Sequence, residues 1–303
     1  MQEPDQNDLH RTTTSHPVLL CPLVTPFTDE TVDTDALGQL VESLAATGID
    51  GFVPCGTSGE VASLTPEERR RVIETTVENS SHGQTVIAGA AATAVRSAVE
   101  RIESAAAAGA DAALLPSPYY HAPNSPAGLK QFFAAVADDA ALPIYLYDIP
   151  SCTGQQIPTE VTEALSSHPN IVGLKDSSGD YEHFSAVLRA TPDDFDVYQG
   201  FDTQFVQSVQ IGATGGICGL TNATPEIFLD VATAIVEGNY ERAARLQQTA
   251  ITPIFDVGLE EGFAPVLKTA AVASGRLSSH HVRPPLIETS TEGVALIEDV
   301  LST

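Results

Sequence analysis

The sequence predicts an α/β fold, a (β/α)8 TIM barrel with a three-helix appendage at its C-terminal end. Eight short apolar runs alternate with longer segments of helical periodicity, which is the pattern of parallel strands covered by helices. A glycine recurs where a helix has to end and turn into the next strand, at Gly48, Gly109 and Gly212. The length of 303 residues, 43% of them hydrophobic, suits one large barrel with an ample core.

The eight apolar runs are the predicted strands of the barrel. In chain order they span residues 18–25, 51–55, 85–91, 112–116, 144–147, 171–175, 196–200 and 215–219. The helical segments between them include residues 35–46, 66–79, 95–108, 127–137 and 202–211. An open doubly wound sheet is the alternative, but no G-x-G-x-x-G follows the first strand, so the usual nucleotide site of that fold is missing.

The barrel is predicted to occupy residues 18–238, with a different kind of segment on each side. Residues 1–17 are polar and acidic without an apolar stretch, which predicts a disordered or loosely held arm and not a secretion signal. Residues 239–303 are predicted to form a helical extension packed on the barrel. Its helices are expected at residues 240–257, with a bend at Pro253, and at 260–274 and 291–301.

The charge balance excludes some partners and indicates an environment. Forty acidic residues against 14 Lys and Arg give a net charge of −26. Nucleic-acid binding is therefore excluded, because phosphate contacts need clustered basic residues. No apolar run is long enough to span a membrane. Self-repulsion at this charge is relieved by concentrated salt, so we expect a cytoplasmic protein of a halophile.

Cysteine and histidine spacing argues against a metal site. The four cysteines are far apart with no C-x-x-C pair, which predicts reduced, mostly buried thiols and no disulfide framework. The adjacent His280 and His281 are expected in a solvated turn, and no histidine pair has ligand spacing at a strand end. A metal-dependent enzyme is accordingly disfavoured, and we expect no metal cofactor.

Lys175 is the candidate nucleophile. It ends an apolar strand, at the edge of the barrel where active sites of this fold lie, and desolvation there favours the neutral amine that forms a Schiff base with a ketone. A snorkelling or ion-paired lysine is the alternative. The chain has only two other lysines, Lys130 and Lys268, which we expect to be surface or interface cations.

Two neighbouring strand ends carry further candidates. Tyr147 ends the preceding strand and can exchange a proton with a substrate hydroxyl, although a strand tyrosine is commonly a core residue; Asp148 after it is expected to cap the loop. The second strand leads into Gly56-Thr57-Ser58-Gly59-Glu60, where backbone N–H groups and hydroxyls suit a carboxylate. A plain glycine turn is the other interpretation.

Taken together, these motifs resemble the dihydrodipicolinate synthase and N-acetylneuraminate lyase superfamily of pyruvate-type class I aldolases. The likeness covers nearly all of residues 18–300. It rests on VTPF (24–27), GTSGE (56–60), PYY (118–120), YDIP (147–150) followed by TG (153–154), GLKDSSG (173–179), GFD (200–202), and GGI (215–217) leading to Asn222.

The resemblance implies roles for particular residues. Lys175 forms an imine with pyruvate or another 2-oxo acid, so no other cofactor is needed, and Tyr147 acts as acid and base. Thr57 and Ser58, with Gly56, bind the substrate carboxylate, and Thr57 relays protons. Tyr120 would enter the active site of a neighbouring subunit in a homotetramer built as a dimer of dimers. The remaining substrate contacts are expected from Gly200, Asp202, Thr203 and Ile217.

The choice of substrate depends on one loop. Synthases of this superfamily usually carry an Arg after the catalytic Tyr for the carboxylate of the second substrate, and Cys152 stands there. The sequence therefore most resembles a 2-keto-3-deoxygluconate aldolase of carbohydrate metabolism, which yields pyruvate and glyceraldehyde. His121-Ala122-Pro123-Asn124 lacks the Arg of aldolases that accept the phosphorylated acid. The alternative is 4-hydroxy-tetrahydrodipicolinate synthase, which condenses pyruvate with aspartate semialdehyde.

Two further possibilities use the same barrel. A hydratase or dehydratase would form the same imine without carbon–carbon cleavage. A regulatory barrel would bind a sugar acid without turnover, but the pair of Tyr147 and Lys175 argues against it.

Overall fold

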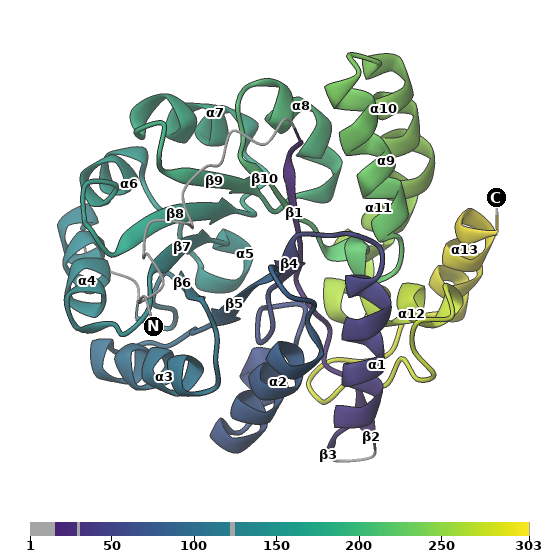
Figure 1. The fold of residues 1–303 in the computed structure, drawn as a ribbon, viewed down its shortest axis with the longest axis horizontal. Helices are drawn as coiled ribbons and strands as arrows, with labels where there is room; N and C mark the ends of the chain where they lie inside the picture. The colour runs from purple at the N-terminus through teal and green to yellow at the C-terminus, as the bar shows by residue number, and fades with distance from the viewer. Residues whose placement is uncertain (1–15, 29–30, 122–124, 303) are drawn as a thin grey trace.

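The chain forms a closed barrel of eight parallel strands, as expected from the sequence (Figure 1). The computed structural model describes residues 16–28, 31–121 and 125–302, so most of the predicted N-terminal arm, residues 1–17, lies outside it. Around the barrel the strands follow the order β1, β4, β5, β6, β7, β8, β9, β10, and β10 pairs with β1 to close it. Their bounds are β1 Val18–Cys21, β4 Gly51–Phe52, β5 Thr85–Gly89, β6 Ala112–Pro116, β7 Ile144–Asp148, β8 Ile171–Asp176, β9 Asp196–Gln199 and β10 Gly215–Ile217.

Several strands are shorter than predicted because the backbone leaves the hydrogen-bonded ladder early. β4 ends two residues before Pro54, which has no N–H to donate. β10 ends at Ile217 because Gly219 begins a short 3-10 turn, η3 (Gly219–Asn222). A two-stranded hairpin of β2 (Phe27–Thr28) and β3 (Thr31–Val32) follows the first strand.

Helices follow the strands and cover the outside of the barrel (Figure 1). The longer helices bear an apolar face that the strands' outward side chains meet, and their ends show the expected signals. Thr65 and Glu68 form a reciprocal capping box at the start of α2, and Gly48, Gly109 and Gly212 adopt positive φ after helices. The helices are α1 Thr34–Ala45, α2 Pro66–Asn79, α3 Val95–Ala107, α4 Pro126–Asp139, α5 Pro150–Thr153, α6 Thr159–Leu165, α7 Tyr181–Ala190, α8 Phe205–Gln210, after the 3-10 turn η2 Asp202–Gln204, and α9 Pro225–Val236.

The C-terminal helices pack on one side of the barrel, beside α9 (Figure 1). They are α10 Tyr240–Leu246, the π-helical turn η4 Gln247–Ile251, α11 Thr252–Glu261, α12 Phe263–Ala273 and α13 Thr291–Leu301. The irregularity predicted at Pro253 lies just before it, in the π turn, since Pro253 fits the first turn of α11. The break between α11 and α12 falls at Gly262, where φ is +96°.

The barrel interior is closed by large side chains from the inward face of the strands. Tyr145 donates a hydrogen bond to Asp196 at 3.0 Å and packs beside Tyr198, so these side chains fill this part of the barrel interior. The other interior residues are Leu20, Val53, Ile87, Ala112, Leu114, Tyr147, Ile149, Val172 and Ile217. Substrate access is consequently left to the carboxyl ends of the strands. No helix in the described part of the chain is long and apolar enough to cross a membrane.

Candidate active site

Lys175 and Tyr147 are brought together as the sequence predicted. They occupy paired positions in the ladder of β7 and β8, and the Lys175 Nζ lies 4.6 Å from the centre of the Tyr147 ring. Both side chains are buried, at 5% exposure each. In the described residues no carboxylate pairs with the amine, so the geometry leaves Lys175 available to a ligand.

Gly200 supplies space for the Lys175 side chain. A Cβ at this position would lie 2.6 Å from the Lys175 Cε and 2.2 Å from the Ser177 Oγ, both shorter than real contacts. A side chain at position 200 would therefore displace the amine from its place beside Tyr147. This gives Gly200 a steric role next to the candidate nucleophile.

The loop after β4 is held in a tight, unusual backbone path. Cys55 and Glu60 both have left-handed backbone angles, with φ of 58° and 54°. Thr25 donates from Oγ1 to the carbonyl of Gly59 at 2.8 Å, and a Cβ at Gly59 would meet the Leu23 carbonyl at 2.9 Å. The loop thus presents Thr57 as an exposed side chain at the barrel mouth, with Ser58 half-buried beside it.

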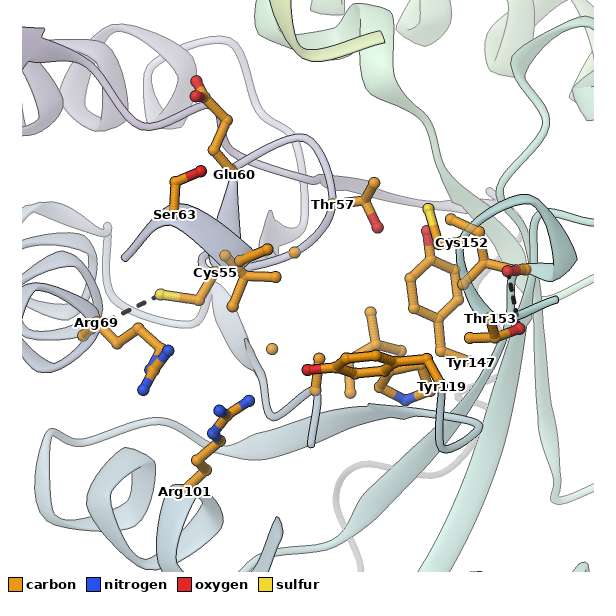
Figure 2. A pocket seen from close by; sticks show the side chains of 18 of the residues that line it. Cys55, Thr57, Glu60, Ser63, Arg69, Arg101, Tyr119, Tyr147, Cys152 and Thr153 are labelled. Carbon is orange, nitrogen blue, oxygen red and sulfur yellow. Dashed lines mark hydrogen bonds between the residues drawn. The ribbon is translucent and has the colours of Figure 1, made fainter. Parts of the chain in front are cut away.

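A cavity of about 550 Å³ opens at this end of the barrel (Figure 2). Gly56, Thr57 and Tyr147 line it. Cys152 of α5 lines it as well, and it stands where an Arg is expected to bind the carboxylate of the second substrate. Among the described residues Lys175 does not line the cavity itself, but its amine lies against the ring of Tyr147, which does. The cavity therefore extends from the Tyr147 phenol to the loop that carries Thr57.

Arg69 and Arg101 form a basic end of this cavity that the sequence reasoning missed. Figure 2 shows both guanidinium groups close together on the side opposite Tyr147. Arg69 donates to the Leu64 carbonyl at 2.9 Å, and burial together with the Arg101 charge lowers its pKa. Neither arginine forms an ion pair with a described residue. Two such groups favour an anionic ligand.

Three of the predicted substrate contacts occupy less open positions. Asp202 is 2% exposed, and its carboxylate accepts hydrogen bonds from the N–H groups of Gly219 at 2.9 Å and Leu220 at 2.8 Å. Burial raises the pKa of Asp202 to about 6. The structure thus uses this carboxylate to hold the turn η3, and its contact with substrate hydroxyls stays a prediction. Thr203 is half-buried, and Ile217 is buried inside the barrel.

Tyr120 points away from the cavity of its own chain. It is 91% exposed, adopts a left-handed backbone with φ of 72°, and contacts only the edge of the neighbouring His121 ring among its aromatic neighbours in the described chain. Tyr119, and not Tyr120, lines the cavity. The geometry is compatible with the predicted contribution of Tyr120 to a neighbouring subunit, which stays a prediction. Residues 122–124 of the following loop lie outside the described residues.

Lys268, predicted to be a surface or interface cation, lies at an internal interface and not on the surface. Its side chain is fully buried at the seam between α12 and the barrel, where Nζ lies 2.5 Å from Glu60 Oε1 and donates to the His281 carbonyl at 2.7 Å. The aromatic ring of Phe27 lies 4.1 Å from the same amine. A helical pattern cannot reveal such a partner, because Glu60 is far away in sequence. Lys130 is exposed, as predicted.

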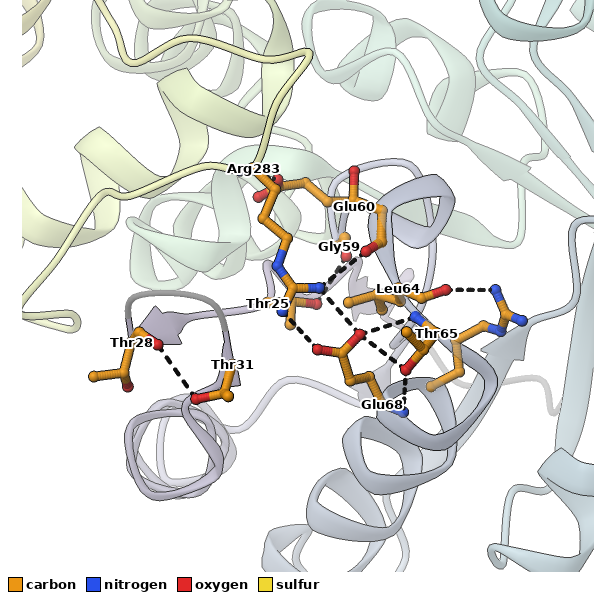
Figure 3. A network of polar contacts seen from close by, with 11 residues as sticks. Thr25, Thr28, Thr31, Gly59, Glu60, Leu64, Thr65, Glu68 and Arg283 are labelled. Carbon is orange, nitrogen blue, oxygen red and sulfur yellow. Dashed lines mark hydrogen bonds and ion pairs between the residues drawn. The ribbon is translucent and has the colours of Figure 1, made fainter.

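Glu60 and its neighbours tie the Thr57 loop to the C-terminal extension. The N–H of Arg283 donates to Glu60 Oε2 at 3.0 Å, and the Arg283 guanidinium pairs with Glu68 at 2.5 Å and donates to the Ser63 carbonyl (Figure 3). The guanidinium also lowers the pKa of Glu68 to about 2. The last residue of the GTSGE motif is therefore an anchor of the loop, a role that the sequence reasoning did not assign.

The thiols agree with the sequence prediction. Cys21, Cys55 and Cys218 are buried and Cys152 is exposed, and all four are free. Burial raises the pKa of Cys21 and of Cys55 to about 12, so both are protonated at neutral pH. These buried thiols fill the core around the site.

One cluster of histidine and carboxylates in the described residues is close enough to share a cation or a proton. It consists of Asp148, Asp176 and His183, whose facing atoms lie within 4.8 Å of one another. Asp148 also caps its loop as predicted, since Oδ1 accepts from the N–H of Ile157 at 3.0 Å. Strand alternation could have placed the two aspartates on the outer face, but nothing in the sequence pairs them with His183.

Comparisons with known proteins agree on one group. The sequence pattern of the Dihydrodipicolinate synthetase family matches residues 17–303. A 4-hydroxy-tetrahydrodipicolinate synthase of Methanothrix thermoacetophila is 38% identical, over 92% of this chain and 94% of its own. The crystal structure of dihydrodipicolinate synthase from Aquifex aeolicus superposes with a TM-score of 0.88 at 33% identity, covering 95% and 97% of the chains. A prophage protein of the dihydrodipicolinic acid synthase family from E. coli K12, solved in complex with pyruvate, gives a TM-score of 0.87 at 28% identity, covering 94% and 97%.

Proposed function

We propose that this chain, which belongs to the dihydrodipicolinate synthetase family, is a 4-hydroxy-tetrahydrodipicolinate synthase. Membership of the family makes it a pyruvate-dependent class I aldolase, which works through a lysine imine without a separate cofactor. Its reaction would condense pyruvate with aspartate semialdehyde. The preference for an aldolase of 2-keto-3-deoxygluconate, drawn from Cys152 and from Asp202 and Thr203 as contacts for sugar hydroxyls, gives way to this assignment. Curated relatives between 34% and 38% identical carry the synthase name.

The observation that carries the proposal is the basic end of the cavity. Arg69 and Arg101 could receive the carboxylate of aspartate semialdehyde, the group for which Cys152 offers no charge. A guanidinium–carboxylate hydrogen bond contributes about 1.5–3 kcal/mol, so two such donors offset the absence of one arginine in the loop. The relatives' names support the same substrate.

The chemistry begins on Lys175. Its neutral amine attacks C2 of pyruvate and loses water to give the iminium, while Thr57, Ser58 and the Gly56 backbone hold the carboxylate. Tyr147, through Thr57, takes a C3 proton, which gives the enamine, and C3 then attacks the aldehyde carbon of the semialdehyde. Tyr147 returns this proton by the same route to the new alkoxide. The semialdehyde's own amine then attacks C2, closes the ring and releases Lys175.

We also propose that assembly completes this site. The exposed Tyr120 would join the proton relay of a neighbouring subunit in a homotetramer. A trans-complementation experiment tests this: inactive Y120F and K175M chains are dissociated, mixed and reassembled. Recovery of about a quarter or more of the activity of wild type would support a shared site, whereas no recovery would contradict it.

A second candidate is the 2-keto-3-deoxygluconate aldolase. The specific observation in its favour is Cys152, which lines the cavity and has no charge for a second acidic substrate. The same imine would then cleave the C3–C4 bond, with Tyr147 taking the proton from the C4 hydroxyl and glyceraldehyde leaving.

Substrate consumption separates the two. The protein is incubated in concentrated salt with pyruvate plus either aspartate semialdehyde or glyceraldehyde, and the loss of each aldehyde is followed. We expect loss of the semialdehyde; loss of glyceraldehyde alone would favour the aldolase. R101Q is expected to raise the KM for the semialdehyde about tenfold and leave the KM for pyruvate unchanged. The matched control is R96Q, on the same helix, whose side chain is 90% exposed.

A further inference from the structure

Two buried carboxylates lie directly behind the candidate catalytic pair. Asp148 and Asp176 are the last residues of β7 and β8, each one position after Tyr147 and Lys175, and they are themselves paired in the ladder. Side chains alternate between the two faces of a strand, so the aspartates point outward where the pair points into the barrel. Both are buried, with exposures of 0% and 1%.

His183 of α7 lies between them. Its Nε2 is 3.3 Å from Asp148 Oδ2 and 3.9 Å from Asp176 Oδ2, and these three buried atoms have no other hydrogen-bond partner in the described structure. The remaining carboxylate oxygens are occupied, because Asp148 accepts from Ile157 N–H and Asp176 accepts from Ser178 N–H at 2.7 Å. On the other side of the ring, Nδ1 lies 3.5 Å from the hydroxyl of Thr159.

Electrostatics requires a positive charge at this point. Two carboxylates this close, removed from water, repel each other unless a proton or cation lies between them. Burial raises the pKa of Asp148 and raises that of Asp176 to about 6. The two aspartates, with Asp180 at the N-cap of α7, raise the pKa of His183 against the effect of its burial. All three shifts favour a proton shared between the two carboxylates and the imidazole.

We propose that His183 is a positioning residue for the lysine–tyrosine pair: as an imidazolium between Asp148 and Asp176 it holds the ends of β7 and β8 together and so fixes Lys175 relative to Tyr147. Because the strand ends are adjacent in the ladder, a small separation there changes the distance between the reacting groups. A displacement of about 1 Å in such a geometry costs about 10²-fold in rate.

The test compares H183Q with wild type. We expect H183Q to lower kcat by about 10- to 100-fold while the KM for pyruvate stays nearly constant. We also expect wild type to lose kcat as the imidazolium deprotonates at alkaline pH, and H183Q to lack this loss. Adding D148N to H183Q removes one of the opposed charges and should restore part of kcat. The control is H168Q, because the His168 Nε2 also lies close to a carboxylate, 3.1 Å from the exposed Asp138, but on the barrel surface.

Other outcomes would overturn the inference. An H183Q protein with unchanged kcat and pH profile but lower thermal stability would reduce His183 to a structural contact. Stoichiometric metal in purified wild type that is absent from H183Q would make the cluster a metal site. If H183Q does not fold, an NMR titration of His183 in wild type tests the proposal instead. A His183 imidazole that is neutral at pH values below 6.5, the ordinary pKa of histidine, would contradict it.

The inference rests on the proposed roles of Lys175 and Tyr147, and borohydride trapping separates the two claims. Absence of a pyruvate adduct on Lys175 in wild type would break the proposed function. An adduct in wild type together with unaltered H183Q kinetics would break only the positioning role.

Discussion

Two buried lysines of this chain lie in similar surroundings and differ in their partners. Lys175 in the barrel mouth and Lys268 at the seam with the extension each place Nζ over an aromatic ring, at 4.6 Å and 4.1 Å. Lys268 is held by a carboxylate at 2.5 Å and a carbonyl at 2.7 Å, whereas Lys175 has no such partner in the described residues. Burial alone therefore does not indicate an imine-forming lysine. An amine that is already paired cannot attack a ketone, so the partner distinguishes the two.

The largest expected effect is the loss of activity on removing the Lys175 amine. K175M should lower kcat more than about 10³-fold, because the covalent step is lost, and should change the free energy of unfolding by less than about 1 kcal/mol. Steady-state rates and denaturant unfolding measure the two effects. Retained activity, or an adduct trapped on another lysine, would contradict the comparison.

The matched variant at the seam should do the reverse. K268M leaves Glu60 buried without its cation, which costs about 3–5 kcal/mol in the free energy of unfolding, while pyruvate should still be trapped on Lys175. Denaturant unfolding measures the loss, with the exposed-lysine variant K130M as control. E60Q combined with K268M should recover part of the stability. A K268M protein as stable as K130M would show that the pair contributes nothing.

A smaller effect is expected from acid at the same seam. The Arg283 guanidinium lowers the pKa of Glu68 from 4.5 to about 2. The ionised carboxylate therefore contributes its full stabilisation at pH values above its pKa in the unfolded chain, and this stabilisation is lost as the pH falls towards 2. We expect up to about 3 kcal/mol over that interval, and E68Q should remove this part of the dependence. Unfolding at several pH values checks it; identical pH slopes for wild type and E68Q would contradict it.

The smallest effect concerns salt. The charge of −26 predicts that wild type gains stability when KCl is raised to about 1 M, where the screening length is about 3 Å. The Lys268–Glu60 pair is buried and should not be screened. The difference in unfolding free energy between wild type and K268M should therefore change by less than about 0.5 kcal/mol. Equal stability of wild type in dilute buffer and in KCl would show that the acidic surface has no such role.

Local periodicity was enough to predict the barrel and the pair at its mouth. Each strand is an apolar run ending near a chemically distinctive residue, so Tyr147 and Lys175 could be placed side by side from strand order alone. The choice of substrate could not be settled in this way, because Cys152 says only which charge is missing. Arg69 and Arg101, which we propose supply the compensating charge, come from two outer helices whose surface arginines look ordinary in sequence.

The rest could not be predicted because it depends on contacts between distant segments. Lys268 has the spacing of any helical residue, and only the folded chain brings Glu60 against it. Likewise His183 stands in the first turn of a helix and meets Asp148 and Asp176 only when that helix covers the ends of β7 and β8. Partners that lie far apart in sequence leave no periodic signal.

The anchor on Glu60 has a consequence for the order of synthesis. Its two ties, to Lys268 and to the backbone of Arg283, span 208 and 223 residues of sequence. A ribosome has therefore released every barrel strand before the segment that fixes the Thr57 loop exists. Nascent chains ending before Lys268 would lack both contacts, so we expect the Thr57 loop to take its final position only when translation is nearly complete.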